Sequence, residues 1–318
     1  MPKTPTDPPQ AFGGPTMGSR WSVLIDDAAA HPALQSQFQA AVDEVDAQMS
    51  TWTRSSDLMR LNAAPLDSWV ALPDRLMTVL AAGLSVSRQT GGAFEMNVGD
   101  AVRAWGFGPE KIDLGAIRAA SSTPRLPAAA ALELDPAKGR ARKSAPLALD
   151  LSGIAKGYGV DRLAETAAQF GVTQALCTID GEVRAIGSRR SGRPWAVGID
   201  MPDDKATGHH STLALEEMAV ATSGDYRHFV TVAATRLSHT IDPRRGAPVI
   251  APPSSVTVLS RSCMMADAMA TALLVMGEEQ GAGFARTHGI SALFLRRTSG
   301  ETVMTGTEIF AATSCQAG

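Results

Sequence analysis

The feature that most constrains this fold is a series of strand-like runs in the C-terminal half that follow one another without intervening helices. Residues 174–187, QALCTIDGEVRAIG, hold two alternating runs around Asp180-Gly181, a dipeptide suited to a tight hairpin turn. Residues 193–200, 213–222 and 228–242 continue in the same style. Because the strands come in antiparallel runs and do not alternate strictly with helices, the sequence predicts an α+β fold and not a doubly wound parallel sheet.

Helical patterns lie on both sides of these runs. Apolar residues recur at helical spacing over residues 33–49, and further helices are predicted for 74–90, for about 154–170 and for 264–277. Two more hairpins are expected, one that closes the chain at 290–306 and one within 123–150. The latter should turn at Pro136–Gly139, with its second strand ending at Asp150.

Composition excludes several classes of protein. The chain has 318 residues, of which 44% are hydrophobic and 19% are charged, a composition typical of globular proteins. A net charge of −3 gives no basis for nucleic-acid binding, and no stretch is apolar enough to cross a membrane. The cysteines Cys177, Cys263 and Cys315 lack zinc-site spacing and are expected to be small core residues or unreactive thiols.

The N-terminal residues 1–14 are polar and proline-rich, and we expect them to be disordered. They contain neither a signal-peptide pattern nor a lipidation cysteine. We therefore expect a cytoplasmic protein, with a periplasmic location as the alternative if an export signal has been removed.

The segment DLSGIAKGYGVD, residues 150–161, places Lys156 in a glycine-rich turn that opens a helix. Free N–H groups and the dipole at a helix N-terminus suit a phosphate, and Gly153 and Gly157 would allow close approach. It does not satisfy the P-loop pattern GxxxxGK[ST], and the chain contains no complete dinucleotide fingerprint, HExxH or GxSxG. The alternative is a Ser N-cap, with Asp150 bonded locally and the lysine in water.

Two further segments carry candidate chemistry. In ADAMAT, Asp267 and Thr271 are four residues apart, so their oxygens share one helix face and suit Mg²⁺; the alternative is that they cap and bond the helix locally. In LSHTIDP, His239 lies close to Asp242 and could act as a general base, although a structural histidine is the alternative.

Taken in order, seven segments resemble the ApbE family of FAD:protein FMN transferases over nearly the whole chain, from about Thr16 to the last hairpin. They are PTMGSRW, MSTWTRSSDLMRLN, GGAFEMNVG with WGFG, LDLSGIAKGYGVD, AVATSGDYRHF, SHTIDPRRGAPV and SVTVLSRSCMMADAMATALLVMG. The resemblance implies one flavin transferase domain, residues 15–318, made of two T-fold-like α+β halves with mainly antiparallel sheets and an FAD/Mg crevice between them.

The resemblance also implies an activity. An enzyme of this family cleaves the pyrophosphate of FAD, attaches the FMN half to a Ser or Thr hydroxyl of an acceptor protein through a phosphoester bond, and releases AMP. Two alternatives stay open: an FAD pyrophosphatase that yields FMN and AMP, and a non-catalytic protein that binds or delivers FAD.

Site residues follow from the same resemblance. Met17 and Trp52 would contact the flavin, and Ala93, Phe94 and Glu95 would line the FAD pocket. Relatives usually carry Tyr at the position of Trp52 and Asp at that of Glu95.

Further along the chain, Asp150, Lys156 and Ile241 would also bind FAD. The resemblance assigns the Mg²⁺ ligands to three further residues: the Gly153 carbonyl, Asp267 and Thr271.

His239 would take the proton of the acceptor hydroxyl. The sequence departs from the family pattern where Asp180-Gly181-Glu182 replaces the common Gly-Gly-Asp, and where Arg245 replaces a Thr in the following turn.

Overall fold

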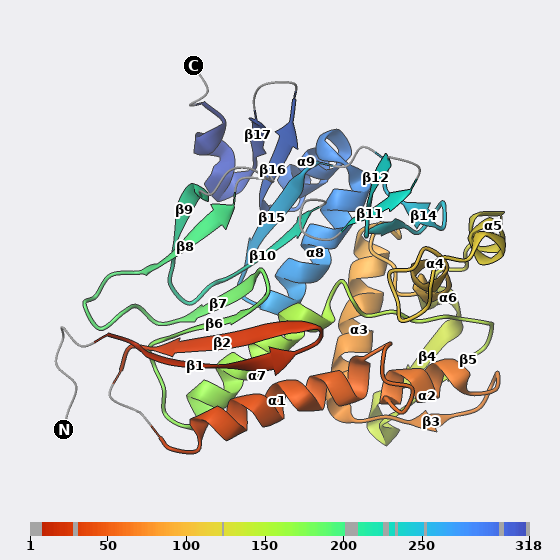
Figure 1. Ribbon diagram of the computed structural model, residues 1–318, viewed down its shortest axis with the longest axis horizontal. Helices are drawn as coiled ribbons and strands as arrows, with labels where there is room; N and C mark the ends of the chain where they lie inside the picture. Colours follow the sequence, from red (N-terminus) through yellow and green to blue (C-terminus); the bar gives the residue numbers. More distant parts are fainter. Residues whose placement is uncertain are drawn as a thin grey trace.

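One eight-stranded antiparallel sheet organises the molecule (Figure 1). The computed structural model describes residues 8–27, 31–122, 124–200, 209–224, 229–232, 235–250, 253–298 and 302–315. In spatial order the strands are β1 (Gln10–Thr16), β2 (Ser19–Ile25), β6 (Ala175–Ile179), β7 (Glu182–Ile186), β10 (Ala219–Gly224), β15 (Ser255–Ser260), β16 (Ser291–Arg297) and β17 (Thr302–Gly306). Every pairing within this sheet is antiparallel, which confirms the predicted α+β class.

The sheet consists of two halves with the same order of elements. The first runs β1, β2, α1 (Leu34–Met49), α7 (Ala155–Gln169), β6, β7, and the second runs β10, β15, α8 (Cys263–Met276), α9 (Glu278–Thr287), β16, β17. Helices α1 and α7 pack on the first half, α8 and α9 pack on the second, and α7 also packs against α8. The α7–α8 contact therefore joins the halves on the helical side of the sheet.

A long insertion separates α1 from α7. It contains α2 (Asp57–Ala63), β3 (Val70–Ala71), α3 (Asp74–Gln89), α4 (Gly99–Ala104), α5 (Leu114–Ser122), α6 (Ala128–Ala131), β4 (Leu132–Asp135), the 3₁₀ turn η1 (Pro136–Lys138) and β5 (Arg140–Lys143). Strands β3, β5 and β4 form a small sheet.

The hairpin expected within residues 123–150 is present and turns as predicted, but its second strand ends at Lys143 and not at Asp150. Beyond that point the backbone amides find other partners: Ala148 and Leu149 donate to the Asn97 and Asn62 side chains, and Asp150 donates to the Met96 carbonyl. Residues 148–150 are therefore held by side chains and loops and not by a strand.

Three two-stranded sheets complete the part of the chain that the structure describes. They are β8 (Trp195–Asp200) with β9 (His209–Leu215), β11 (Phe229–Val232) with β12 (Thr235–Ser238), and β13 (Ile241–Asp242) with β14 (Ala247–Pro248); the 3₁₀ segment η2 (Glu308–Cys315) follows β17. The β8–β9 hairpin packs Trp195 and Leu215 against Val183 and Val220 of the main sheet.

Three sequence expectations can be compared directly with these elements. Strand β1 already begins at Gln10, within the segment 1–14 expected to be disordered, because it pairs with β2 along its whole length; residues 1–7 lie outside the described part. Cys177 and Cys263 are buried and free, as expected, whereas the side chain of Cys315 is not described. No described helix has the length and apolar character needed to span a membrane.

Candidate active site

One cavity collects most of the predicted site residues from distant parts of the sequence. It is lined by the start of α7, the β6–β7 turn, β8, β10, α8 and the segment before β13. Ten of the twelve residues that the resemblance assigns to the site line it: Ala93, Phe94, Glu95, Asp150, Gly153, Lys156, His239, Ile241, Asp267 and Thr271.

The backbone at the start of α7 lies close to α8 at two glycines. A Cβ on Gly153 would lie 3.0 Å from Thr271 Oγ1, so the backbone at Gly153 runs directly against the Thr271 hydroxyl. A Cβ on Gly157 would lie 2.4 Å from the Cys263 carbonyl oxygen, which leaves no room for one. These glycines bring the predicted phosphate loop into contact with α8.

Three backbone amides of this helix start already have partners within the protein. Ile154 and Ala155 donate to the Leu151 carbonyl, and the Gly157 N–H donates to Asp267 Oδ2 at 2.9 Å. These three N–H groups therefore do not face a ligand. An anion at this place would depend mainly on the side chain of Lys156.

Lys156 lies among three carboxylates. Its Nζ is 3.0 Å from Glu182 Oε1 and 3.2 Å from Asp180 Oδ2. Burial alone lowers the pKa of Lys156, but the charges of Glu182, Asp267 and Asp180 outweigh burial and raise it above its ordinary value. Lys156 is consequently protonated at any physiological pH.

Asp267 is buried on the inner face of α8, with 4% of its surface exposed. Burial, and then the charge of Glu182, raise the pKa of this carboxyl, while Lys156 and the Gly157 N–H act in the opposite direction. The carboxylate is thus a charge that the surrounding protein compensates only in part. Its neighbour one turn on, Thr271, is 3.3 Å from the Ser223 hydroxyl.

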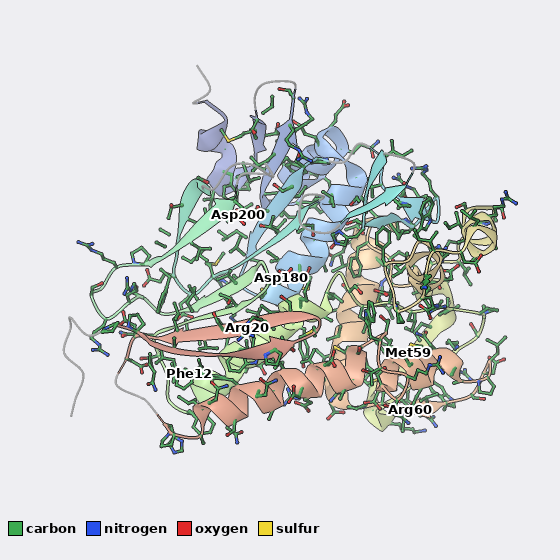
Figure 2. The ribbon with its side chains drawn as sticks, viewed as in Figure 1. Phe12, Arg20, Met59, Arg60, Asp180 and Asp200 are labelled. Atoms are coloured by element: carbon green, nitrogen blue, oxygen red, sulfur yellow. The ribbon has the colours of Figure 1, made fainter. Side chains whose placement is uncertain are left out.

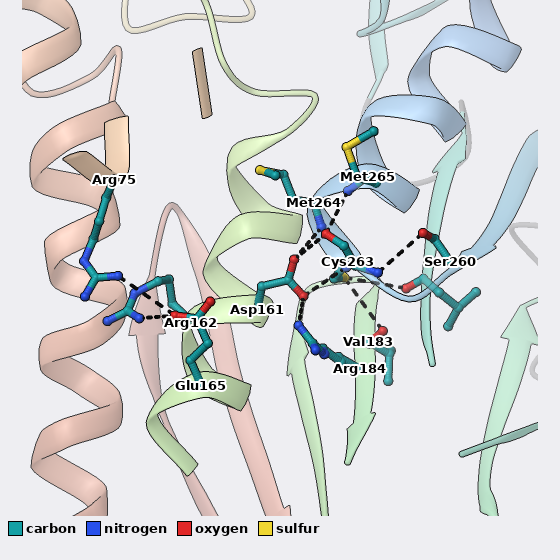
Figure 3. Close-up of polar contacts among 12 residues, drawn as sticks. Arg75, Asp161, Arg162, Glu165, Val183, Arg184, Ser260, Cys263, Met264 and Met265 are labelled. Carbon is teal, nitrogen blue, oxygen red and sulfur yellow. Dashed lines mark hydrogen bonds and ion pairs between the residues drawn. The ribbon is translucent and has the colours of Figure 1, made fainter. Parts of the chain in front are cut away.

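The N-terminus of α8 is fixed by Asp161 of α7 (Figure 3). Asp161 accepts hydrogen bonds from the backbone amides of Cys263 and Met264, both at 3.0 Å, and from the Ser262 hydroxyl at 2.8 Å. Arg184 of β7 pairs with the same carboxylate at 2.6 Å. Since Asp267 follows Cys263 by about one helical turn, this cap sets the position of Asp267 in the cavity.

Two other predicted residues have different environments. Glu95 accepts three hydrogen bonds, from the Ser87 hydroxyl and from the amides of Asn97 and Ala128, so its carboxylate holds the cavity wall together. Asp150 uses one oxygen to accept from the Ser152 amide, but its buried Oδ2 has no hydrogen-bond partner among the residues that the structure describes. A buried polar atom without a partner is costly, so Asp150 is the better candidate for a ligand contact.

His239 enters the cavity from the segment between β12 and β13. Its ring and the Phe107 ring form a T-shaped pair, with centroids 6.5 Å apart and planes at 76°. Ile241 follows on β13 and packs in a small cluster with Ala101 and Ala120. The unit made of α4, α5 and β13–β14 thus carries the predicted base to the cavity.

Met17 and Trp52 are not among the residues that line the cavity. Met17 occupies the β1–β2 turn with a φ of 45°, and its methyl group lies against Gly159 of α7. Trp52 is 64% exposed, so its side chain presents a large aromatic face to solvent. Their roles at the flavin remain predictions.

The cavity also contains residues that sequence reasoning did not assign to it. They are Val98, Val102, Ser152, Asp180, Gly181, Glu182, Val183, Val197, Gly198, Ile199, Asp200, Leu213, Val220, Thr222, Ser223, Gly224, Thr240 and Pro243. The hairpin Asp180-Gly181-Glu182 was visible in the sequence as a turn, and Ser223 as part of the motif ATSGDYRHF. The β8–β9 residues carried no signal, because their apolar alternation is typical of any core strand.

A family model and two curated proteins that resemble this chain all point to the same family. The sequence model of the ApbE family matches residues 17–294. The FAD:protein FMN transferase of Vibrio cholerae is 35% identical over 299 residues, which cover 90% of this chain and 87% of that protein. The enzyme of the same name from Klebsiella pneumoniae is 32% identical and covers 92% and 86% of the two chains.

Solved structures agree over nearly the whole chain. The flavin transferase ApbE from Vibrio cholerae superposes with a TM-score of 0.84 at 32% identity and covers 96% of this chain and 99% of that one. The apo flavinyl transferase ApbE of Pseudomonas stutzeri gives 0.83 at 34% identity, with 96% of each chain covered.

Proposed function

This chain belongs to the ApbE family, and from that premise we propose that it is an FAD:protein FMN transferase that moves the FMN half of FAD onto a Ser or Thr hydroxyl of an acceptor protein. The acceptor oxygen forms a bond to the FMN phosphorus, the pyrophosphate P–O bond breaks, and AMP leaves with the bridging oxygen. What supports the proposal most is that Lys156, His239, Asp267 and Thr271, from three distant segments, line one cavity.

The charge balance of the cavity favours a metal ion alongside the substrate. Among its described lining residues there are six carboxylates and a single lysine. A diphosphate is itself anionic, so the site needs added positive charge to bind one. Asp267, whose charge is only partly compensated, is the natural ligand.

The oxygen atoms around Asp267 suit Mg²⁺. Thr271 contributes a hydroxyl from the same helix, and the Gly153 backbone runs against that hydroxyl, so we assign the ion to Asp267, Thr271 and the Gly153 carbonyl. No three His, Cys, Asp or Glu side chains of the described chain are grouped for a metal, but the assigned set needs only one carboxylate. When bound, Mg²⁺ neutralises charge on the pyrophosphate and on the departing AMP.

Lys156 supplies the permanent positive charge next to this set. Because the amides of Ile154, Ala155 and Gly157 are used internally, the glycine-rich loop holds the pyrophosphate through the lysine ammonium and not through a backbone cradle. The loop's glycines then serve to bring α7 against α8.

His239 is the general base of the proposed reaction. A neutral imidazole at the cavity wall takes the proton of the incoming hydroxyl as the new P–O bond forms. The Phe107 ring lies beside the imidazole and nearly perpendicular to it. A purely FAD-binding protein would not require such a base, which favours the enzyme over the delivery protein.

An FAD pyrophosphatase is the second candidate, since water could replace the acceptor hydroxyl at the same site. To separate the two, the protein is incubated with FAD and Mg²⁺, with and without a tagged acceptor that carries a Thr flavinylation motif. Flavin fluorescence on the acceptor together with AMP, both lost on chelation, is the expected result. AMP with free FMN and an unlabelled acceptor would identify the pyrophosphatase, and FAD binding without either product would identify the delivery protein.

A further inference from the structure

The β6–β7 hairpin supplies two carboxylates, those of Asp180 and Glu182, that form ion pairs with Lys156. Glu182 and Asp180 both contact the ammonium group, at 3.0 and 3.2 Å, and both line the cavity (Figure 2 marks Asp180). Two of the three hydrogens that Lys156 can donate are thus directed toward protein carboxylates. An anion that enters the cavity must therefore compete with these two carboxylates for the lysine.

The two carboxylates are not equivalent. The Glu182 side chain is 3% exposed and belongs to β7, which pairs with β6 on one side and β10 on the other, so its position is fixed. The Asp180 side chain is 21% exposed and sits in the two-residue loop of the hairpin. Asp180 is therefore the partner that an anion can replace.

The backbone at Asp180 is also unusual. Its φ is 57°, in the left-handed region, where glycine is favoured and Asp or Asn is tolerated at some cost. The Asp180 side chain lines the cavity, and its Oδ2 lies 3.2 Å from Lys156 Nζ. The choice of Asp at a position suited to glycine thus has its main effect on the charge of the site.

We propose that Asp180 is an internal competitor for Lys156 that lowers the affinity of the site for the diphosphate of its substrate and so sets the FAD concentration at which the enzyme works. This inference rests on the proposed function, since it takes FAD as the anionic ligand. The diphosphate replaces Asp180 at one hydrogen of Lys156, while Glu182 keeps the lysine in place. Breaking the ion pair between Asp180 and Lys156 costs free energy, and this cost lowers the measured affinity for FAD.

Two substitutions separate the charge of Asp180 from its backbone. Asp180→Asn removes the charge and keeps a residue tolerated at positive φ, whereas Asp180→Gly removes the charge and also relieves the backbone. The dissociation constant for FAD, by flavin fluorescence, and KM and kcat for transfer are measured with Mg²⁺ at low and high salt. Asp57→Asn, which breaks an exposed ion pair with Arg60 on α2, is the matched control.

Both Asp180 variants should bind FAD more tightly by about 1.5- to fivefold, the range for one partly exposed charge pair. KM should fall in parallel, kcat should stay within about twofold, and the gain should shrink at high salt. The control should match the wild type.

Four results would overturn the inference. Tighter binding by Asp180→Gly alone would assign the effect to the backbone, and weaker binding or a higher Mg²⁺ requirement in Asp180→Asn would make Asp180 a ligand. Unchanged FAD affinity in both variants would remove the competition and leave the proposed function intact. Failure of the wild type to bind FAD at all would overturn both together.

Discussion

The Asp267 carboxylate accepts a hydrogen bond from the backbone N–H of Gly157, 2.9 Å away, and this bond joins α8 to α7 at the cavity. A Cβ at position 157 would lie 2.7 Å from the Cβ of Asp267, and neither atom belongs to a flexible side-chain end. The contact between the two halves of the fold and the position of the proposed metal ligand therefore depend on the same glycine.

Gly157→Ala should damage both stability and activity. The added methyl group forces α7 and α8 apart, which we expect to cost about 1–3 kcal/mol in the free energy of unfolding. Thermal unfolding and FAD turnover measure the two effects. Gly283→Ala is the control, because a Cβ there in α9 meets nothing within 4 Å, and it should leave stability unchanged or raise it by up to about 1 kcal/mol. Full activity in Gly157→Ala would contradict the close contact.

His239→Ala should slow FMN transfer by roughly two to four orders of magnitude, the usual contribution of a general base, while the dissociation constant for FAD changes little. Single-turnover labelling of the acceptor and FAD titration test the two parts. His288→Ala, which removes an exposed ring stacked on Phe284, should behave as the wild type. A His239→Ala variant that transfers FMN at the wild-type rate would exclude His239 as the base that takes the proton of the acceptor hydroxyl.

Asp267→Asn should abolish metal-dependent turnover with little loss of thermal stability. The amide keeps an oxygen that can accept from the Gly157 N–H, but it lacks the charge that holds Mg²⁺. The rate as a function of Mg²⁺ concentration and the melting temperature without metal are the measurements. An Asn variant with the wild-type Mg²⁺ dependence would exclude Asp267 as a ligand.

Asp161→Ala should be among the most destabilising single changes in the described chain. It leaves the N-terminal amides of α8 and the Arg184 guanidinium without their buried partner, which we expect to cost about 3–5 kcal/mol. Chemical denaturation provides the free energy of unfolding. Glu133→Gln, which alters an exposed pair with Arg142, should cost at most about 1 kcal/mol. A similar loss in both variants would refute the capping role.

The sequence predicted those parts of the fold whose pattern is local. Helix α8, the β16–β17 hairpin and the Asp180-Gly181 turn follow from periodicity and turn chemistry, and all three are present. Strand β5 ends earlier than predicted, because residues 148–150 bond to Asn62, Asn97 and Met96 from distant segments, which no local pattern reveals.

The site residues also fall into those that the local sequence indicates and those that only tertiary contacts place. Lys156, Asp267 and Thr271 could be selected as candidates, since their residue types and spacing point to anion and metal chemistry. The cavity wall from β8 and β9 could not, because Val197 and Leu213 resemble ordinary core residues until the hairpin is placed on the sheet. The ion pairs of Lys156 with Glu182 and Asp180 likewise depend on a tertiary contact between α7 and the β6–β7 turn.

The most direct test of the central claim is the intact mass of an acceptor protein after incubation with this enzyme, FAD and Mg²⁺. The account predicts an acceptor heavier by one FMN less one water, AMP in equal amount, and no mass change when the motif's Thr is replaced by Ala. An unmodified acceptor alongside stoichiometric free FMN and AMP would contradict it.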